Sequence, residues 1–277
     1  MTKRLIINAD DYGISREVND AIENLIDAGK LQNVSVVANS WFYSTAAAFL
    51  RRHTDCSVGA HLNIVEGIAV SPTEKIRPLI GEHGQLVRLD ELFRRWLMSP
   101  FAVAAAVELE WRSQIELLLS DGIQITHADS HQHVHAFPPF WNILTRLCRE
   151  FGIPAVRSPR ERNGLRLRRL ASYALQGSAR VASTLHSLRG LAANDHFLGF
   201  KRAGAYGEVE LISDVKNLRA GVTELACHPS LYADVPYPGY RGDLEYKALS
   251  GSEIWRQIAD SDVELVTWRS LSEEAAI

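Results

Sequence analysis

Short runs of apolar, often β-branched residues recur along the chain, and each run predicts a buried strand. Between them lie longer segments whose apolar residues follow helical spacing. In the first of these, Val18, Ile22 and Leu25 fall on one face. Ser15 is the expected N-cap of that helix and Gly29 its expected end. The expected strands are Leu5–Asn8, Val34–Ala38, Ser57–Leu62, Gln124–His127, Ala155–Arg157, Glu224–Cys227 and Glu264–Thr267.

Strands that alternate with helices of about ten residues or more favour a parallel sheet with crossover helices. Seven strands with no linker or internal repeat fit a single domain over residues 1–277, and we expect a (β/α) barrel that is closed or nearly closed. The Pro- and Gly-rich stretch Glu66–Leu86 is expected to form a substrate loop or lid. The further expected helices are Thr45–Arg52, Leu89–Met98, Ala102–Ser120, Phe140–Phe151 and Ser252–Ser261.

An arginine-rich insertion interrupts this rhythm around residues 157–200. Eight arginines lie between Arg157 and Arg189, against the single acid Glu161. The simpler interpretation is a solvated amphipathic helix. The alternative is contact with an anionic substrate, or weak peripheral contact with a membrane surface.

Composition narrows the class of protein. A net charge of −3 and a pI near 6.4 argue against binding to nucleic acid through its phosphates. Cys56, Cys148 and Cys227 are odd in number and far apart, which favours free buried thiols in a reducing compartment. The first strand begins within four residues of Met1, and no apolar run is long enough to span a membrane. We therefore expect no signal peptide and a cytoplasmic protein.

Polar residues of metal-binding type follow several of the expected strands. Asp10 and Asp11 end the first strand, His61 lies near the end of the third, and His228 follows the sixth. Four histidines follow the fourth strand, within the segment His127–His135. Because ligands gather at the carboxyl ends of parallel strands, these residues are expected to converge on one rim.

Two adjacent carboxylates such as Asp10 and Asp11 repel each other and are costly to bury, so a cation is the expected compensation. One carboxylate with two imidazoles suits Zn²⁺, Fe²⁺, Ni²⁺ or Co²⁺, and Mg²⁺ when more oxygen ligands join them. Such a metal lowers the pKa of a bound water and polarises a carbonyl. The second aspartate could then take a proton, and a protonated His228 could donate one to a leaving amine. The set predicts a metal-dependent amide hydrolase.

Each residue also has a simpler interpretation when taken alone. The aspartate pair could cap the next helix, His61 could be a hydrogen-bonded core histidine, and His228 before a proline could belong to a structural turn. In the histidine cluster, alternate residues of a strand or loop share a face, yet His131, His133 and His135 cannot all reach one ion. One of the three is the expected ligand, and the others are expected behind it or facing the substrate.

Four segments together resemble the YdjC-like (ChbG/HpnK) carbohydrate deacetylases. The segments are Asn8–Gly13, Gly59–Asn63, Thr126–His135 and Cys227–Pro229. The resemblance covers residue 4 to about residue 230, in order and spacing, but does not include the arginine-rich insertion. It implies a distorted barrel similar to that of NodB-type deacetylases, a divalent metal (Mg²⁺ or Zn²⁺) and an N-acetylated amino sugar, either soluble or lipid-linked, as substrate. A homo-oligomer is compatible with it.

By this resemblance, the metal ligands are Asp11, His61 and His131. Asp10 corresponds to the general base and His228 to the acid. The residues expected behind the ligands or facing the substrate are Asn8, Asn63, His127, Asp129, His133 and His135.

Three other functions remain open from the residues. Another metallohydrolase on a related barrel is one, although an amidohydrolase normally has His-x-His where this chain has Asp10 and Asp11. An Fe²⁺ oxygenase would suit the ligand set but leaves Asp10 and His228 without a role. A non-catalytic sugar-binding protein would bind sugar without releasing acetate.

Overall fold

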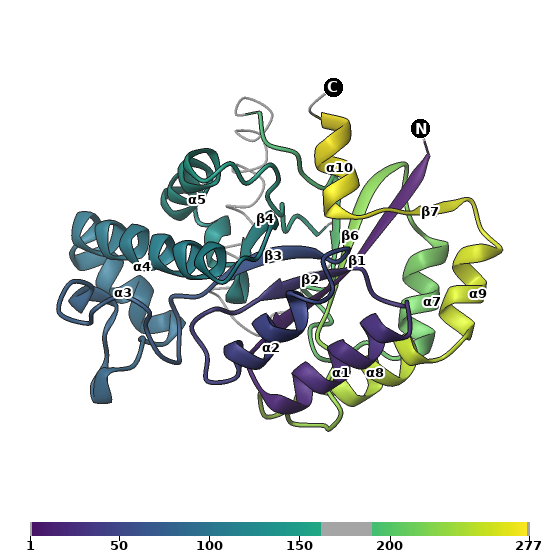
Figure 1. Cartoon of the computed structure of the whole chain (residues 1–277), viewed down its shortest axis with the longest axis horizontal. Helices are drawn as coiled ribbons and strands as arrows, with labels where there is room; N and C mark the ends of the chain where they lie inside the picture. Colours follow the sequence, from purple (N-terminus) through teal and green to yellow (C-terminus); the bar gives the residue numbers. More distant parts are fainter. Residues whose placement is uncertain (1, 162–189, 276–277) are drawn as a thin grey trace.

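The computed structural model describes residues 2–161 and 190–275. Its centre is one curled sheet of seven strands, and every pairing between these strands is parallel (Figure 1). The strand order is β4-β3-β2-β1-β6-β5, and β7 pairs with the first residues of β1. The strands are β1 (Lys3–Tyr12), β2 (Asn33–Val36), β3 (Ser57–Leu62), β4 (Ile125–Ser130), β5 (His196–Leu198), β6 (Gly221–Cys227) and β7 (Val263–Leu265). The curled parallel sheet confirms the predicted fold class.

Helices surround the sheet, and their apolar faces close the core against it (Figure 1). In the first helix, Val18, Ile22 and Leu25 are buried as the spacing predicts, and Ser15 Oγ accepts the backbone N–H of Val18. The helices are α1 (Arg16–Asp27), α2 (Tyr43–Leu50), α3 (Leu89–Met98), α4 (Pro100–Ser120), α5 (Pro138–Glu150), α7 (Glu208–Lys216), α8 (Gly242–Ser250), α9 (Glu253–Ala259) and α10 (Trp268–Ala275). The predicted helices are confirmed, whereas the short α7, α8 and α10 were not predicted.

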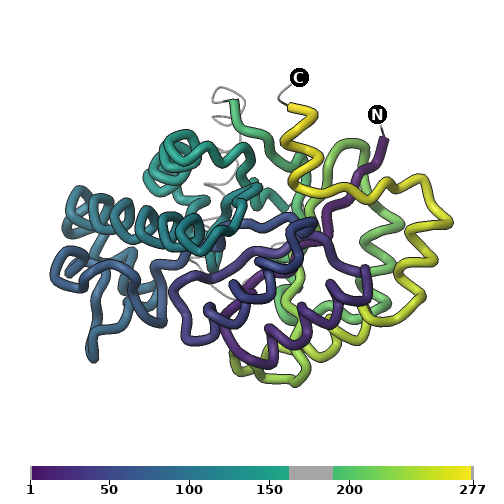
Figure 2. Tube along the Cα trace, viewed as in Figure 1, coloured from purple at the N-terminus to yellow at the C-terminus, as the bar shows by residue number. Residues whose placement is uncertain are grey.

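The first residues of β1 and helix α10 lie on the same side of the molecule (Figure 2), and Arg4 pairs with Glu274. All three cysteines are free and buried, as predicted. Within the described residues, no helix is long and apolar enough to span a bilayer.

The prediction of a strand at Ala155–Arg157 is wrong. That segment makes only isolated pairings, of Val156 with Ala128 and of Ala155 with Ala192. The sheet instead takes β5 from within residues 157–200, which were predicted to be an insertion. Three residues are too few for a hydrophobic period to reveal a strand. Most of the arginine-rich insertion, residues 162–189, lies outside the described residues.

A bulge at the end of β1 prepares the site. Ala9 pairs with Val34 and Tyr12 with Val36, so two residues of β1 lie opposite one residue of β2. Asp11 has a φ of 63°, in the left-handed region that L-residues seldom adopt. Side chains normally alternate between the two faces of a strand. The bulge breaks this alternation, and the neighbouring carboxylates Asp10 and Asp11 both line the same cavity.

Candidate metal centre and its cavity

A cavity of about 430 Å³ lies at the carboxyl ends of the strands. It is lined by all five residues that were expected to carry the chemistry: Asp10, Asp11, His61, His131 and His228. From the predicted lid Glu66–Leu86, only Glu66 lines it. Farther along that segment, the backbone N–H groups of Val70 and Ser71 donate to Glu110 on α4, which ties it to the helix.

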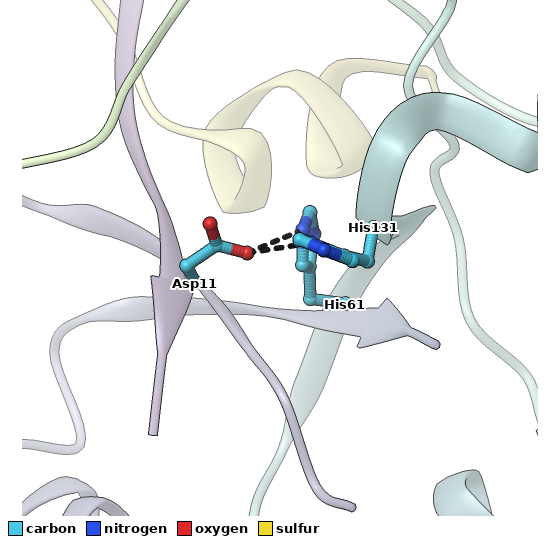
Figure 3. A group of neighbouring side chains, drawn as sticks. All are labelled: Asp11, His61 and His131. Atoms are coloured by element: carbon cyan, nitrogen blue, oxygen red, sulfur yellow. Dashed lines mark hydrogen bonds and ion pairs between the residues drawn. The ribbon is translucent and has the colours of Figure 1, made fainter. Parts of the chain in front are cut away.

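Three of these side chains point toward one another from different elements (Figure 3). Asp11 Oδ1 lies 2.8 Å from His131 Nδ1 and 3.3 Å from His61 Nε2. Two atoms that bind one ion at about 2.1 Å lie about 3 Å from each other, so these separations suit a shared metal. The donors, one carboxylate and two imidazoles, also suit a divalent ion with open positions. The three residues therefore fit the metal centre that the sequence predicts.

The imidazoles of His131 and His61 balance the charge of Asp11 in the metal-free protein. Burial by itself would raise the pKa of Asp11, but the charges and hydrogen bonds of His131 and His61 hold that pKa well below its ordinary value. Burial would lower the pKa of His61, yet the charges of Asp129 and Asp10, with hydrogen bonds to Asp11 and Asp129, raise it to about 10. In the metal-free protein His61 thus carries a positive charge, which a bound metal would replace.

Asp10 is compensated differently, by Arg157. Arg157 Nη1 donates to Asp10 Oδ2 at 2.6 Å, and Nη2 donates to Asp10 Oδ1 at 2.7 Å. The same guanidinium bonds Glu224 through Nε and Nη2, and Nη1 lies 2.6 Å from Asp129 Oδ2. All four side chains are buried. Arg157 therefore supplies the cation that the sequence predicts for Asp10, and a metal would be needed only at Asp11.

The prediction that Arg157 belongs to a solvated insertion is wrong, because it is fully buried. Among the described residues, two groups have the chemistry to hold a metal ion, and the position of Arg157 favours the first of them. Asp10, His61 and Asp129 have ligand atoms as close together as those of the first group. However, Arg157 Nη1 lies 2.6 Å from both Asp10 Oδ2 and Asp129 Oδ2, so the guanidinium already provides the positive charge there.

Glu224 is the third acid around this guanidinium. Burial raises its pKa to about 7 even though Arg157 opposes the rise. Trp268 Nε1 also donates to Glu224 Oε1, at 3.3 Å. Arg157 thus contacts Asp10, Asp129 and a third carboxyl group, Glu224, that titrates near neutrality.

His228 lies on the other side of Asp10. Its Nε2 is 4.0 Å from Asp10 Oδ2, and its ring contacts Tyr240 edge to face with centroids 5.8 Å apart. Its backbone N–H donates to the buried carboxylate of Glu245 on α8. Within the part of the chain that the structure describes, His228 Nδ1 is buried without a hydrogen-bond partner.

Two of the predicted supporting residues hold the central side chains directly. Asn8 Nδ2 donates to Asp10 Oδ1 at 2.8 Å. Asp129 Oδ1 accepts the Nδ1 proton of His61 at 2.8 Å, and its Oδ2 accepts from Ser35 at 2.9 Å. Because a carboxylate only accepts, Asp129 keeps the proton of His61 on Nδ1 and leaves Nε2 toward the metal group.

Of the other four predicted supporting residues, one lines the cavity and three do not. His133 lines the cavity and stacks on Phe200, with centroids 5.3 Å apart. His127 stacks under Trp268, and burial lowers its pKa to about 3. The remaining two support the backbone: Asn63 Oδ1 accepts from Val65 N, and His135 bonds Ser130 Oγ and the carbonyl of Arg157.

Sequence reasoning missed several residues of the site. Arg157 and Glu224 carried a usable signal, because each is a charge directly after or inside an apolar run. Phe200, Tyr237 and Tyr240 line the cavity from loops, and nothing in their spacing marks them.

The chain is similar to known proteins over nearly its whole length. A family model described as YdjC-like protein matches residues 4–260. A carbohydrate deacetylase of Brevibacillus brevis is 28% identical over 272 residues, which cover 97% of this chain and 99% of the relative. A carbohydrate deacetylase of Homo sapiens is 29% identical and covers 95% of this chain and 89% of the relative. A crystal structure from Enterococcus faecalis, of a protein provisionally named for cellobiose-phosphate cleavage, shares the fold at a TM-score of 0.81 and 20% identity, covering 98% of this chain and 99% of that one.

Proposed function

The chain belongs to the YdjC-like family, and we propose that it is a metal-dependent carbohydrate deacetylase that removes the N-acetyl group from an amino sugar. The observation that carries the proposal is the convergence of Asp11, His61 and His131 with Asp10 and His228 on one cavity. The shared name of relatives that match nearly the whole chain supports it.

The geometry suggests a role for each residue. Asp11, His61 and His131 would hold a divalent ion, Mg²⁺ or Zn²⁺, which acidifies water and polarises the amide carbonyl. Asp10 accepts the proton of the attacking water, and Arg157 keeps its carboxylate in place with two hydrogen bonds. As the water oxygen bonds to the carbonyl carbon and the C–N bond breaks, His228 Nε2 donates a proton to the nitrogen. The products are acetate and the free amine.

Acetate release from oligomers of N-acetylglucosamine tests the activity. We expect the metal-loaded protein to release acetate, a chelator to stop the release, and added divalent metal to restore it. Activity that survives both chelation and Asp11→Asn would contradict a metal mechanism.

Two substitutions test how the aspartates divide the work. Asp11→Ala should weaken metal binding in equilibrium dialysis. Asp10→Asn should keep the metal but lower kcat by roughly 10²- to 10⁴-fold, the usual contribution of a general base. Asp20→Asn, an exposed change on α1, is the matched control and should alter neither. Equal loss of metal in the Asp10 and Asp11 variants would show that the assignment is wrong.

Whether the substrate is soluble or lipid-linked is a separate proposal, and we favour the soluble form. Arg157 is buried and unavailable to a membrane, which removes one arginine from the predicted contact surface. Salt-sensitive binding to anionic liposomes would favour a lipid-linked sugar instead. A cytoplasmic location and a homo-oligomer stay predictions, which fractionation and light scattering can check.

A further inference from the structure

We propose that Tyr237 is a positioning residue of the metal centre, an inference that rests on the proposed function. Its phenol oxygen lies 2.8 Å from His131 Nε2, and its ring stacks on the imidazole with centroids 5.7 Å apart. Tyr237 thereby gives His131 an outer partner from a loop, whereas the outer partner of His61 lies on the sheet.

The two ligand histidines show opposite arrangements. His61 turns Nε2 toward Asp11, and its Nδ1 is bound by Asp129. His131 turns Nδ1 toward Asp11, and its Nε2 is bound by Tyr237. In each case one ring nitrogen faces the metal group while the other has an outer partner. Such partners set the ring orientation and the tautomer of a metal-binding histidine.

The two outer partners differ in chemistry and in location. Asp129 is a buried carboxylate on β4, and it can only accept a hydrogen bond. Tyr237 lies between β6 and α8 and lines the cavity, and its hydroxyl can accept as well as donate. When His131 gives its Nδ1 lone pair to a metal, the proton must be on Nε2, and the phenol oxygen is placed to accept it.

Tyr237 is not free to swing away from His131. The backbone N–H of Tyr240 donates to the carbonyl of Tyr237 at 3.1 Å, which closes a tight turn. The carbonyl of Tyr240 in turn accepts from Asp234 N at 2.7 Å. The Tyr240 ring rests on Gly204, where a Cβ would overlap it, and makes a T-shaped contact with the His228 ring. One loop therefore orients both a metal ligand and the proposed acid.

Tyr237→Phe tests the inference, because it keeps the stacked ring and removes only the oxygen. We expect the affinity of the metal-free protein for Zn²⁺ or Co²⁺ to fall by about 10-fold or more in competition with a chromophoric chelator. The visible spectrum of the Co²⁺-bound protein should change, and excess metal should restore most of kcat. Tyr232→Phe, an exposed tyrosine on the same loop, is the control and should behave like the parent.

The outcomes separate this inference from the proposed function. A Tyr237→Phe protein that folds, as thermal unfolding can show, and binds metal with the parent's affinity and spectrum would overturn the inference alone. A parent protein that binds no divalent metal would overturn the proposed metal mechanism and this inference with it.

Discussion

The two sides of the cavity carry different kinds of side chain. On the sheet side, Asp10, His61 and Asp129 are buried charges at strand ends, and each lies within 3.3 Å of a group of opposite charge. On the loop side, His133, Phe200, Tyr237 and Tyr240 present aromatic rings to the same space. The sheet side thus carries charges that must be held rigidly, and the loop side carries surfaces suited to packing against a sugar ring.

The difference follows from the cost of burying charge. A buried carboxylate is tolerated only with a partner at hydrogen-bond distance, and a parallel sheet fixes such partners because its strand ends cannot move independently. A ring stack needs no such precision, because its attraction changes little with small shifts. The comparison predicts that changes on the sheet side affect folding and the reaction together. Changes to loop-side rings that contact neither a candidate metal ligand nor His228, such as Phe200, should affect substrate binding instead.

The largest expected effect comes from removing the charge that joins the sheet side. Arg157→Met leaves Asp10 and Asp129 buried without their partner, and breaking a buried ion pair in this way typically costs about 3–5 kcal/mol. We expect a loss of this size in the free energy of unfolding from urea denaturation, together with loss of activity.

Two further variants test whether the loss comes from the buried guanidinium itself. Arg157→Lys keeps the charge but not the fork of donors, so it should recover part of the stability and little activity. Arg256→Met, which breaks an exposed pair with Glu253, should have a much smaller effect. If the Arg157→Met and Arg256→Met proteins had the same free energy of unfolding, the expectation that the buried ion pairs contribute more than the exposed pair would be wrong.

A smaller effect should appear with pH. Burial lowers the pKa of His127 to about 3, below the ordinary value of 6.5, so only the unfolded chain takes up this proton in mild acid. This contribution to stability is complete above pH 6.5 and is lost as pH falls toward 3. His127→Gln should therefore lose about 1 kcal/mol less stability than the parent between pH 6.5 and 5.5, measured by urea unfolding with a chelator present. Parallel pH profiles of the two proteins would show that His127 is not buried in its neutral form.

The smallest effect is expected on the loop side. Phe200→Ala removes the ring that stacks on His133 but no charge. We expect KM for the sugar to rise by roughly three- to fivefold, as for the loss of one aromatic contact, with kcat and stability nearly unchanged. A fall in kcat as large as that of Asp10→Asn would show that Phe200 takes part in the reaction, and would contradict its assignment to substrate packing.

The local elements were predictable because their cause is local. The helical spacing of Val18, Ile22 and Leu25 and the β-branched run before Asp10 depend only on neighbours in the chain. The strand ends then indicated which polar residues would meet, since parallel strands finish at one edge. The short strand β5 escaped prediction because its three residues owe their conformation to β6 beside them.

The sequence by itself determined the fold class and brought the polar strand-end residues together, and its resemblance to the family supplied Asp11, His61 and His131 as candidate metal ligands. Only the tertiary structure decided what balances each charge and which nitrogen of each histidine faces Asp11. Arg157 pairs with Asp10 across 147 residues, and Tyr237 reaches His131 across 106. Such pairs depend on how loops return to the sheet, which no local spacing encodes. The aspartate pair is the clearest case: a bulge brings both carboxylates to one cavity, yet Asp10 pairs with Arg157 and Asp11 contacts His61 and His131.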